Sequence, residues 1–175
     1  MMKREITCCF TGHRTAKLPW GENEDAPDCR RLKAAIADVL EAVYTAGYRC
    51  FFCGMADGAD MYFGEAVAAL REEHPDVRLE AAVPFPGQER RLSAAGQARY
   101  IRLKQRCDAV TVIRPKYTRG CMMERNRYMV DRSALLIAVY DGRQGGTKST
   151  IHYAAARGLE IIELPVTGLP EESAD

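Results

Sequence analysis

The stretch Ile6-Thr7-Cys8-Cys9-Phe10-Thr11-Gly12-His13-Arg14 joins an apolar, β-branched run to a glycine and two polar side chains. Such a run is typical of a buried strand. Gly12 lets the backbone pass close to a ligand, and His13 and Arg14 carry donors suited to phosphate. A tight turn with two solvated polar residues is the alternative. We expect a strand over residues 6–11 that leads into a ligand-binding segment beginning at Thr11.

Short apolar runs of the same kind recur along the chain and alternate with helical patterns. Further strands are predicted at residues 48–53, 78–83, 109–113, 134–140 and 159–164. Helices are predicted at residues 32–44, 59–70, 88–106, 122–130 and 148–157, and a loop at residues 18–28. This alternation predicts an α/β fold, a Rossmann-like three-layer α/β/α sandwich with a mostly parallel sheet of about six strands.

The composition is that of a globular chain, with 175 residues, 47% hydrophobic residues and 28% charged residues. We expect one domain over residues 1–175, with tails at 1–5 and 165–175. The formal net charge of +1 gives no global attraction to nucleic acid or anionic membrane. A basic stretch from Arg90 to Arg106 could contact DNA phosphates, but a solvated helix face is the commoner role. Nucleic-acid binding is therefore not expected.

The chain shows no signal-peptide pattern, and no apolar run approaches the length of about 18 residues that spans a bilayer. Seven cysteines are present, and Cys8, Cys9, Cys50 and Cys53 lie in apolar runs, where thiols usually serve as small hydrophobes. Cys50 and Cys53 have C-x-x-C spacing, but within a strand rather than at the helix start that activates a thiol. We expect a cytoplasmic protein that contacts no membrane, has structural cysteines and has no metal site.

Residues 54–60, Gly-Met-Ala-Asp-Gly-Ala-Asp, stand where the second strand meets the next helix. Open parallel sheets bind ligands beyond the carboxyl ends of their strands. Asp57 is expected to cap the helix, and Asp60 to favour its first turn. The small residues would let a phosphate or ribose approach the helix start. A capping loop without a ligand is the alternative, because the segment lacks the G-x-G-x-x-G pattern.

Residues 141–147, Asp-Gly-Arg-Gln-Gly-Gly-Thr, follow the fifth strand and lead into Lys148-Ser149-Thr150. Paired glycines followed by hydroxyls at a helix start form an anion cradle, although the P-loop spacing is absent. Gly146 is expected to bring backbone N–H groups against a phosphate, with little room for a Cβ atom. Of the three loops, this one gives the strongest indication of a ligand site.

The helix around residues 122–130 carries a mixed set of side chains. Met122 and Met129 are expected in the core, whereas Arg125 and Asn126 could face a ligand pocket. An exposed charged face is the ordinary alternative for the two polar residues.

Taken in this order, the segments resemble the SLOG superfamily, which joins the LOG phosphoribohydrolases with the DNA-processing protein A fold. The motifs T-G-H-R, G-x-A-x-G-A-D, R-N-x-x-M-V-D and Y-D-G-x-x-G-G-T cover nearly the whole chain and are most similar to the bacterial YpsA/YoqJ-like branch. The resemblance implies a Rossmann-like fold, a nucleotide-derived ligand and a homo-oligomer, most often a dimer.

LOG enzymes cleave the N-glycosidic bond of nucleoside 5′-monophosphates. Their helix motif M-x-x-R-K-x-x-M is matched by Met122, Arg125 and Met129, with Asn126 in place of the lysine. In their P-G-G-x-G-T-x-x-E loop, Thr150 of this chain replaces the glutamate. Glycosidic cleavage passes through an oxocarbenium-like state that a carboxylate stabilises, and threonine cannot carry that charge.

We therefore predict a sensor or binding domain for a nucleotide-derived ligand such as ADP-ribose, NAD or a nucleoside phosphate, with no other cofactor. The alternative is a phosphoribohydrolase in which Arg125 holds the phosphate or leaving group and Asp57 or Asp141 supplies the carboxylate. Asp60 and Glu124 are further candidates for that carboxylate. The predicted ligand-binding residues are Thr11, Gly12, His13, Arg14, Gly54, Ala56, Asp57, Gly58, Asp60, Pro84, Arg125, Asn126, Asp141, Gly142, Gly145, Gly146, Thr147 and Thr150.

Overall fold

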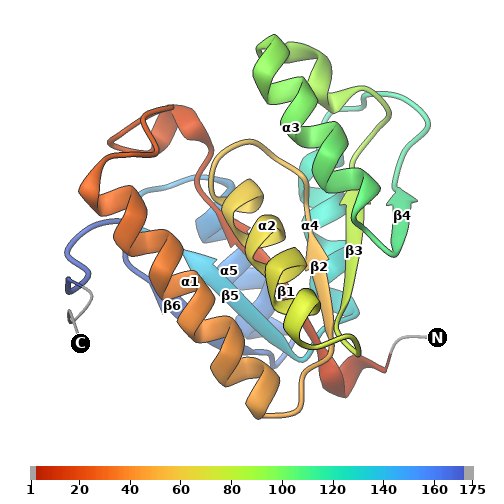
Figure 1. Ribbon diagram of the computed structural model, residues 1–175. Helices are drawn as coiled ribbons and strands as arrows, with labels where there is room; N and C mark the ends of the chain where they lie inside the picture. Colours follow the sequence, from red (N-terminus) through yellow and green to blue (C-terminus); the bar gives the residue numbers. More distant parts are fainter. Residues whose placement is uncertain (1–2, 172–175) are drawn as a thin grey trace.

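The computed structural model describes residues 3–171, which form a six-stranded, wholly parallel sheet flanked by helices (Figure 1). The strands are β1 (Thr7–Gly12), β2 (Cys50–Cys53), β3 (Arg78–Val83), β4 (Ala109–Val112), β5 (Leu135–Val139) and β6 (Glu160–Leu164). Their order in the sheet is β4-β3-β2-β1-β5-β6. The predicted α/β class is confirmed, and each strand lies within two residues of its predicted position.

Five α-helices connect the described strands: α1 (Pro27–Thr45), α2 (Ala59–Glu73), α3 (Ala94–Gln105), α4 (Cys121–Asp131) and α5 (Gly146–Ala156). Three short 3-10 turns occupy Arg4–Ile6, Thr15–Lys17 and Gln88–Arg91. The expected loop at residues 18–28 ends early, because Pro27 occupies the first turn of α1, where a missing N–H costs nothing. The mixed helical stretch expected at about residues 88–106 consists of two pieces, the turn at Gln88–Arg91 and α3. Ser93 interrupts it and caps α3 by accepting a hydrogen bond from Gly96 N at 3.1 Å.

The helices form two layers on opposite faces of the sheet. One layer contains α1, α2 and α3, and the other contains α4 and α5 (Figure 1). Alternate residues of β1 point to opposite faces, so Phe10 packs in the first layer and Cys9 in the second. Phe10 stacks on Phe63 of α2 with ring centroids 4.5 Å apart. The predicted three-layer sandwich is therefore confirmed.

All seven cysteines are free, and all except the half-buried Cys107 are buried. Burial raises the pKa of the Cys9 thiol to about 12 and that of Cys107 to about 11. These thiols fill space, as expected of small hydrophobic side chains. Val166, which was expected in a tail, is only 3% exposed and belongs to the core beneath α1.

The first turn of α2 is held against the loop that follows β1. Gly58, not Asp57, occupies the N-cap position, with φ at +82° and no side-chain cap. A Cβ atom there would lie 2.6 Å from Thr15 N and 2.7 Å from His13 O. Asp57 instead accepts a hydrogen bond from Thr15 N at 3.1 Å, and Ala59 N donates to His13 O at 3.1 Å. The predicted Asp57 cap is wrong because this carboxylate serves a neighbouring segment.

Substituting Gly58 with alanine should therefore destabilise the protein strongly, since it adds a backbone clash to an unfavourable φ. We expect a loss of at least about 3 kcal/mol in the free energy of unfolding. Gly120 is the matched control, because its φ is +86° and its Cβ position is open. Gly120→Ala should cost about 1 kcal/mol. Equal losses in denaturant titrations of the two variants would show that the close approach contributes nothing.

Candidate ligand-binding cleft

A cavity of about 150 Å³ lies beyond the carboxyl ends of β1 and β5. The chain leaves β1 toward the α1 layer and leaves β5 toward the α5 layer, so the two loops diverge and open a crevice. The residues that line it are Phe10, Thr11, Gly12, His13, Arg14, Lys17, Ala56, Asp60, Met122, Arg125, Asn126, Gly146 and Thr147. Four segments that are distant in sequence thus contribute to one cavity.

Most of the predicted ligand-binding residues meet in this cavity, but eight do not line it. These are Gly54, Asp57, Gly58, Pro84, Asp141, Gly142, Gly145 and Thr150. Phe10, Lys17 and Met122 line it although the sequence did not suggest them as ligand contacts. Met122 is half-buried at the cavity wall rather than in the core, whereas Met129 is 1% exposed as expected. The one signal for Lys17 was its place three residues after Arg14.

Arg125 of α4 is the most deeply placed cation in the cavity, with only 4% of its surface exposed. Its Nη1 donates to Gly54 O, and its Nε donates to Asn126 Oδ1 at 2.7 Å. No carboxylate of the residues 3–171 lies within 4.0 Å of its guanidinium. Burial lowers the pKa of Arg125, although the charge of Asp60 opposes that effect, and a further anion would offset more of the cost of burying the guanidinium.

The guanidinium is held in place by a chain of side-chain hydrogen bonds between α4 and α5. Asn126 accepts from Arg125 and donates from Nδ2 to Thr150 Oγ1 at 2.9 Å. Thr150, which is 1% exposed, donates in turn to Gly146 O at 2.8 Å. Asn126 and Thr150 stand where the LOG motifs have a lysine and a glutamate, and here they bind each other. Thr150 therefore supports the cavity from behind rather than facing it.

The N-terminus of α5 faces the same cavity through Gly146 and Thr147. N–H groups of a first helical turn have no acceptor within their own helix, and the helix dipole makes this end positive. A Cβ atom built on Gly146 would meet no protein atom within 4 Å, so any lack of room there would have to come from the phosphate itself. At Gly145 a Cβ atom would lie 2.6 Å from Lys17 Nζ, so the crowding affects the preceding residue.

His13 and Asp141 join the loops after β1 and β5. His13 is 3% exposed, and its Nε2 lies 2.7 Å from Asp141 Oδ1. Asp141 also accepts from Arg143 N at 3.1 Å and from Arg143 Nε at 2.5 Å. Partial burial opposes ionisation of Asp141, but these hydrogen bonds outweigh it and lower the pKa to about 2. Asp141 thus orients the imidazole of His13 and does not line the cavity.

Asp60 is the one carboxylate among the residues that line the cavity. It is 5% exposed, and its Oδ2 accepts from Ala56 N at 3.1 Å. Burial raises the pKa of Asp60, although the charge of Arg125 opposes that rise. Of the other candidate carboxylates, Asp57 binds Thr15 N, and Glu124 pairs with Arg114 on the surface at 2.6 Å.

Glycines 54 and 58 are required by packing within the protein. A Cβ atom on Gly54 would lie 2.8 Å from both Arg125 Nη1 and Asp60 Oδ2, so this glycine leaves room for the two charged side chains. The α2 start, which was expected to receive a phosphate, is covered by the loop after β1, because Ala59 N is bonded to His13 O. The helix N-terminus that lines the cavity is that of α5.

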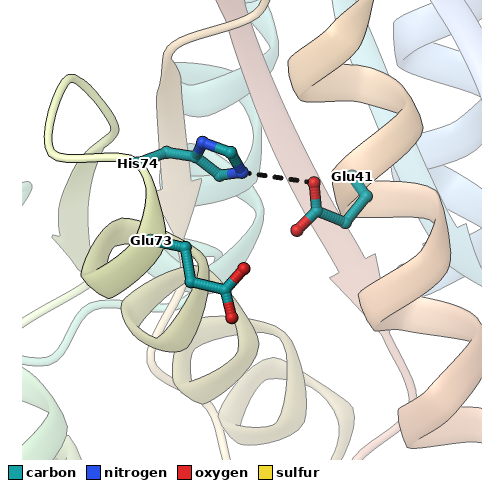
Figure 2. Close-up of side chains that lie close together, drawn as sticks. All are labelled: Glu41, Glu73 and His74. Carbon is teal, nitrogen blue, oxygen red and sulfur yellow. Dashed lines mark hydrogen bonds and ion pairs between the residues drawn. The ribbon is translucent and has the colours of Figure 1, made fainter.

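One group of potential metal ligands lies elsewhere on the described surface. Figure 2 shows His74 reaching toward Glu41, with the Glu73 carboxylate beside them; one ligand atom from each lies within 4.8 Å of the others. His74 Nε2 is 3.3 Å from Glu41 Oε2, and its ring stacks on Tyr44 at 3.9 Å. These contacts account for the imidazole's orientation. Glu73 and His74 lie at the C-terminal end of α2 and Glu41 lies on α1, whereas Asp60 in the cavity belongs to the start of α2.

The basic stretch from Arg90 to Arg106 is partly neutralised by acidic partners. Arg99 pairs with Glu24 and with Glu65, the latter at 2.6 Å, and Arg106 pairs with Glu72 at 2.5 Å. This arrangement agrees with a solvated helix face rather than a phosphate-binding surface. Within residues 3–171, no helix combines the length and apolar character that crossing a membrane requires.

Fold and cleft together define a Rossmann-like α/β protein with a cationic crevice at the switch in strand order. Residues 8–162 match the YspA SLOG family, and the chain belongs to that family. The SPbeta prophage-derived protein YoqJ of Bacillus subtilis is 30% identical over 142 residues, covering 73% of this chain and 82% of the relative. A UPF0398 protein of Staphylococcus epidermidis is 26% identical over 159 residues, covering 90% and 82% respectively. The predicted superfamily and branch are thereby confirmed.

Removing the charge of Asp141 should make the free energy of unfolding depend less on pH in the acidic range. The lowered pKa means that the ionised carboxylate stabilises the fold fully above its ordinary value of 3.8 and progressively less toward pH 2. We expect Asp141→Asn to lose about 1–2 kcal/mol near neutral pH. The deficit relative to wild type should shrink below about pH 5. Denaturant titrations across pH measure both effects.

Asp25→Asn is the control for that experiment, because Asp25 forms a surface pair with Arg30 and is 91% exposed. Its effect should stay below about 0.5 kcal/mol at every pH. A deficit of Asp141→Asn that is unchanged down to low pH would contradict the role assigned to its charge.

Proposed function

We propose that this protein is a binding or sensor domain for a phosphorylated, nucleotide-derived ligand of the ADP-ribose, NAD or nucleoside phosphate type. The phosphate would lie between Arg125, His13 and the N-terminus of α5. The observation that carries the proposal is the buried Arg125, which has hydrogen-bond partners but no carboxylate within 4.0 Å among residues 3–171.

The electrostatics of the cavity favour an anion. Arg14 and Lys17 line it as well, and neither has a carboxylate within 4.0 Å in the described part of the chain. Asp60 supplies one opposing charge; burial raises its pKa above the ordinary value, and the charge of Arg125 opposes that rise. A phosphate with two negative charges would therefore meet an excess of cations and the positive end of a helix dipole.

The cavity volume limits which part of the ligand it can enclose. Pockets for drug-sized ligands range from roughly 300 to 1,000 Å³. The cavity of about 150 Å³ is smaller than that range. It would hold a phosphate with an attached ribose, and the remainder of a nucleotide would extend beyond it.

The decisive experiment replaces Arg125 with methionine, which keeps an unbranched side chain about as long as the stem of arginine and removes the guanidinium and its charge. Calorimetric titration should use ribose 5-phosphate, AMP, ADP-ribose and NAD as probes. We expect at least a tenfold loss of affinity, about 1.4 kcal/mol, for the probes that bind wild type. Adenosine, which lacks phosphate, should be affected by less than about twofold.

Arg127→Met is the matched control, because Arg127 lies on the same helix but is exposed and stacks over Tyr153 at 5.2 Å. This variant should bind phosphorylated probes like wild type. If no probe binds wild type, or if both variants bind equally well, the assignment of Arg125 to a phosphate is wrong.

The α5 end of the cavity is tested at Gly146, where an added side chain has room. Gly146→Ala should leave affinity within about twofold of wild type, whereas Gly146→Asp should lose at least tenfold by repelling the phosphate. Thermal melts of both variants establish that the fold is intact. If Gly146→Asp binds ribose 5-phosphate normally, the anion lies away from α5.

A second candidate function is hydrolysis of the N-glycosidic bond of a nucleoside 5′-monophosphate. The position of Asp60 favours it, because this carboxylate lines the cavity beside Arg125 whereas Asp57 and Asp141 do not. Base release from AMP, followed by chromatography, should then occur with wild type and fall at least a hundredfold in Asp60→Asn, about 2.7 kcal/mol in the barrier. Binding without base release supports the sensor function instead.

A further inference from the structure

A second cavity adjoins the phosphate cavity on the side of β2 and β3, with a volume of about 320 Å³. Arg14, Ala56 and Met122 line both cavities, so the two lie side by side and share these side chains as a wall. The first cavity is rich in cations, and the second is lined largely by apolar and aromatic side chains. Together they reach the volume that pockets for drug-sized ligands have, roughly 300 to 1,000 Å³.

Two aromatic rings form a corner of this second cavity. Phe85 follows β3 and Tyr117 precedes α4, and their ring centroids are 5.4 Å apart with planes at 84°. Tyr117 is 57% exposed, which leaves part of its ring accessible to a ligand in the cavity. A planar group stacked on one ring would meet the other ring edge to face, the two arrangements that aromatic pairs prefer.

Four polar side chains line the cavity, the exposed Arg14 and Arg91 and the hydrogen-bonded Gln88 and Asp57. Gln88 donates from Nε2 to Met55 O at 3.1 Å, which leaves its amide oxygen to accept a further hydrogen bond. Asp57, which also lines this cavity, is held by Thr15 N through one carboxylate oxygen. Apolar walls with a small number of oriented polar groups are typical of sites that recognise a flat heterocycle.

We propose that the second cavity binds the nucleobase of the ligand, with its plane stacked against Tyr117 and its edge read by Gln88 and Asp57. This inference rests on the proposed function, because the phosphate in the first cavity fixes the direction of the ligand. The ribose then lies near Ala56 and Met122, where the two cavities join. The base lies on the β2–β3 side of the switch point, and the phosphate lies between β1 and β5.

Calorimetric titration with ribose 5-phosphate and AMP separates the two cavities, because only AMP carries a base. Wild type should bind AMP at least tenfold more tightly than ribose 5-phosphate. Tyr117→Ala should remove most of that difference and leave the affinity for ribose 5-phosphate within about twofold of wild type. Tyr117→Phe keeps the ring and should retain the preference for AMP.

The possible failures are distinguishable. If ribose 5-phosphate binds through Arg125 and AMP binds no more tightly, the base site is wrong and the phosphate site stands. The base site is also wrong if Tyr117→Ala weakens both ligands equally, or if it leaves the preference for AMP intact. If neither ligand binds wild type, the proposed function fails and the base site fails with it.

Discussion

The parallel pairing of β1 with β5 determines where the polar side chains of this protein meet. Its register runs from Cys8 opposite Leu135 to Gly12 opposite Val139, so both strands end at the same level. The loops that follow β1 and β5 run toward helix layers on opposite faces of the sheet, and Arg125 of α4 lies in the gap between them. In a region shielded from water, a charge held by fixed hydrogen bonds interacts strongly with whatever anion enters. The cleft is thus a direct result of strand order.

The sequence predicted well those elements whose signal is local and strong. The β5 strand is a continuous apolar run, and its observed bounds lie one residue inside the predicted ones at each end. Residues 88–106 gave a weak helical pattern, and the break at Ser93 depends on a single capping bond. Asp57 was placed as a helix cap because capping is the local role of such a residue. Its real partner, Thr15 N, is 42 residues away in sequence and comes close only in the folded chain.

The location of the candidate site could be predicted from the sequence, but most of its side-chain contacts could not. Strand ends in a parallel sheet converge, which correctly brought His13, Arg125 and Gly146 to one cavity. Which side chains would face that cavity depended on distant partners. Asp141 is turned aside by its bonds to His13 and Arg143, and Thr150 is held behind the cavity by Asn126. Met122 follows a helical apolar pattern that does not distinguish a core position from a cavity wall.

The buried thiols have a consequence for the chemistry of the whole molecule. Thiol reagents react with the thiolate form of cysteine. Because burial raises the pKa of the half-buried Cys107 to about 11, little of its thiol is ionised at neutral pH and it reacts slowly. A cysteine introduced at an open surface position such as Ile101, which is 50% exposed, would have an ordinary pKa of about 8.5. Its thiolate fraction at neutral pH would be much larger than that of Cys107, because the pKa of Cys107 is raised by burial. The native fold therefore already protects its own sulfur atoms, and a fluorophore or spin label can be attached at one chosen site without removing any of them.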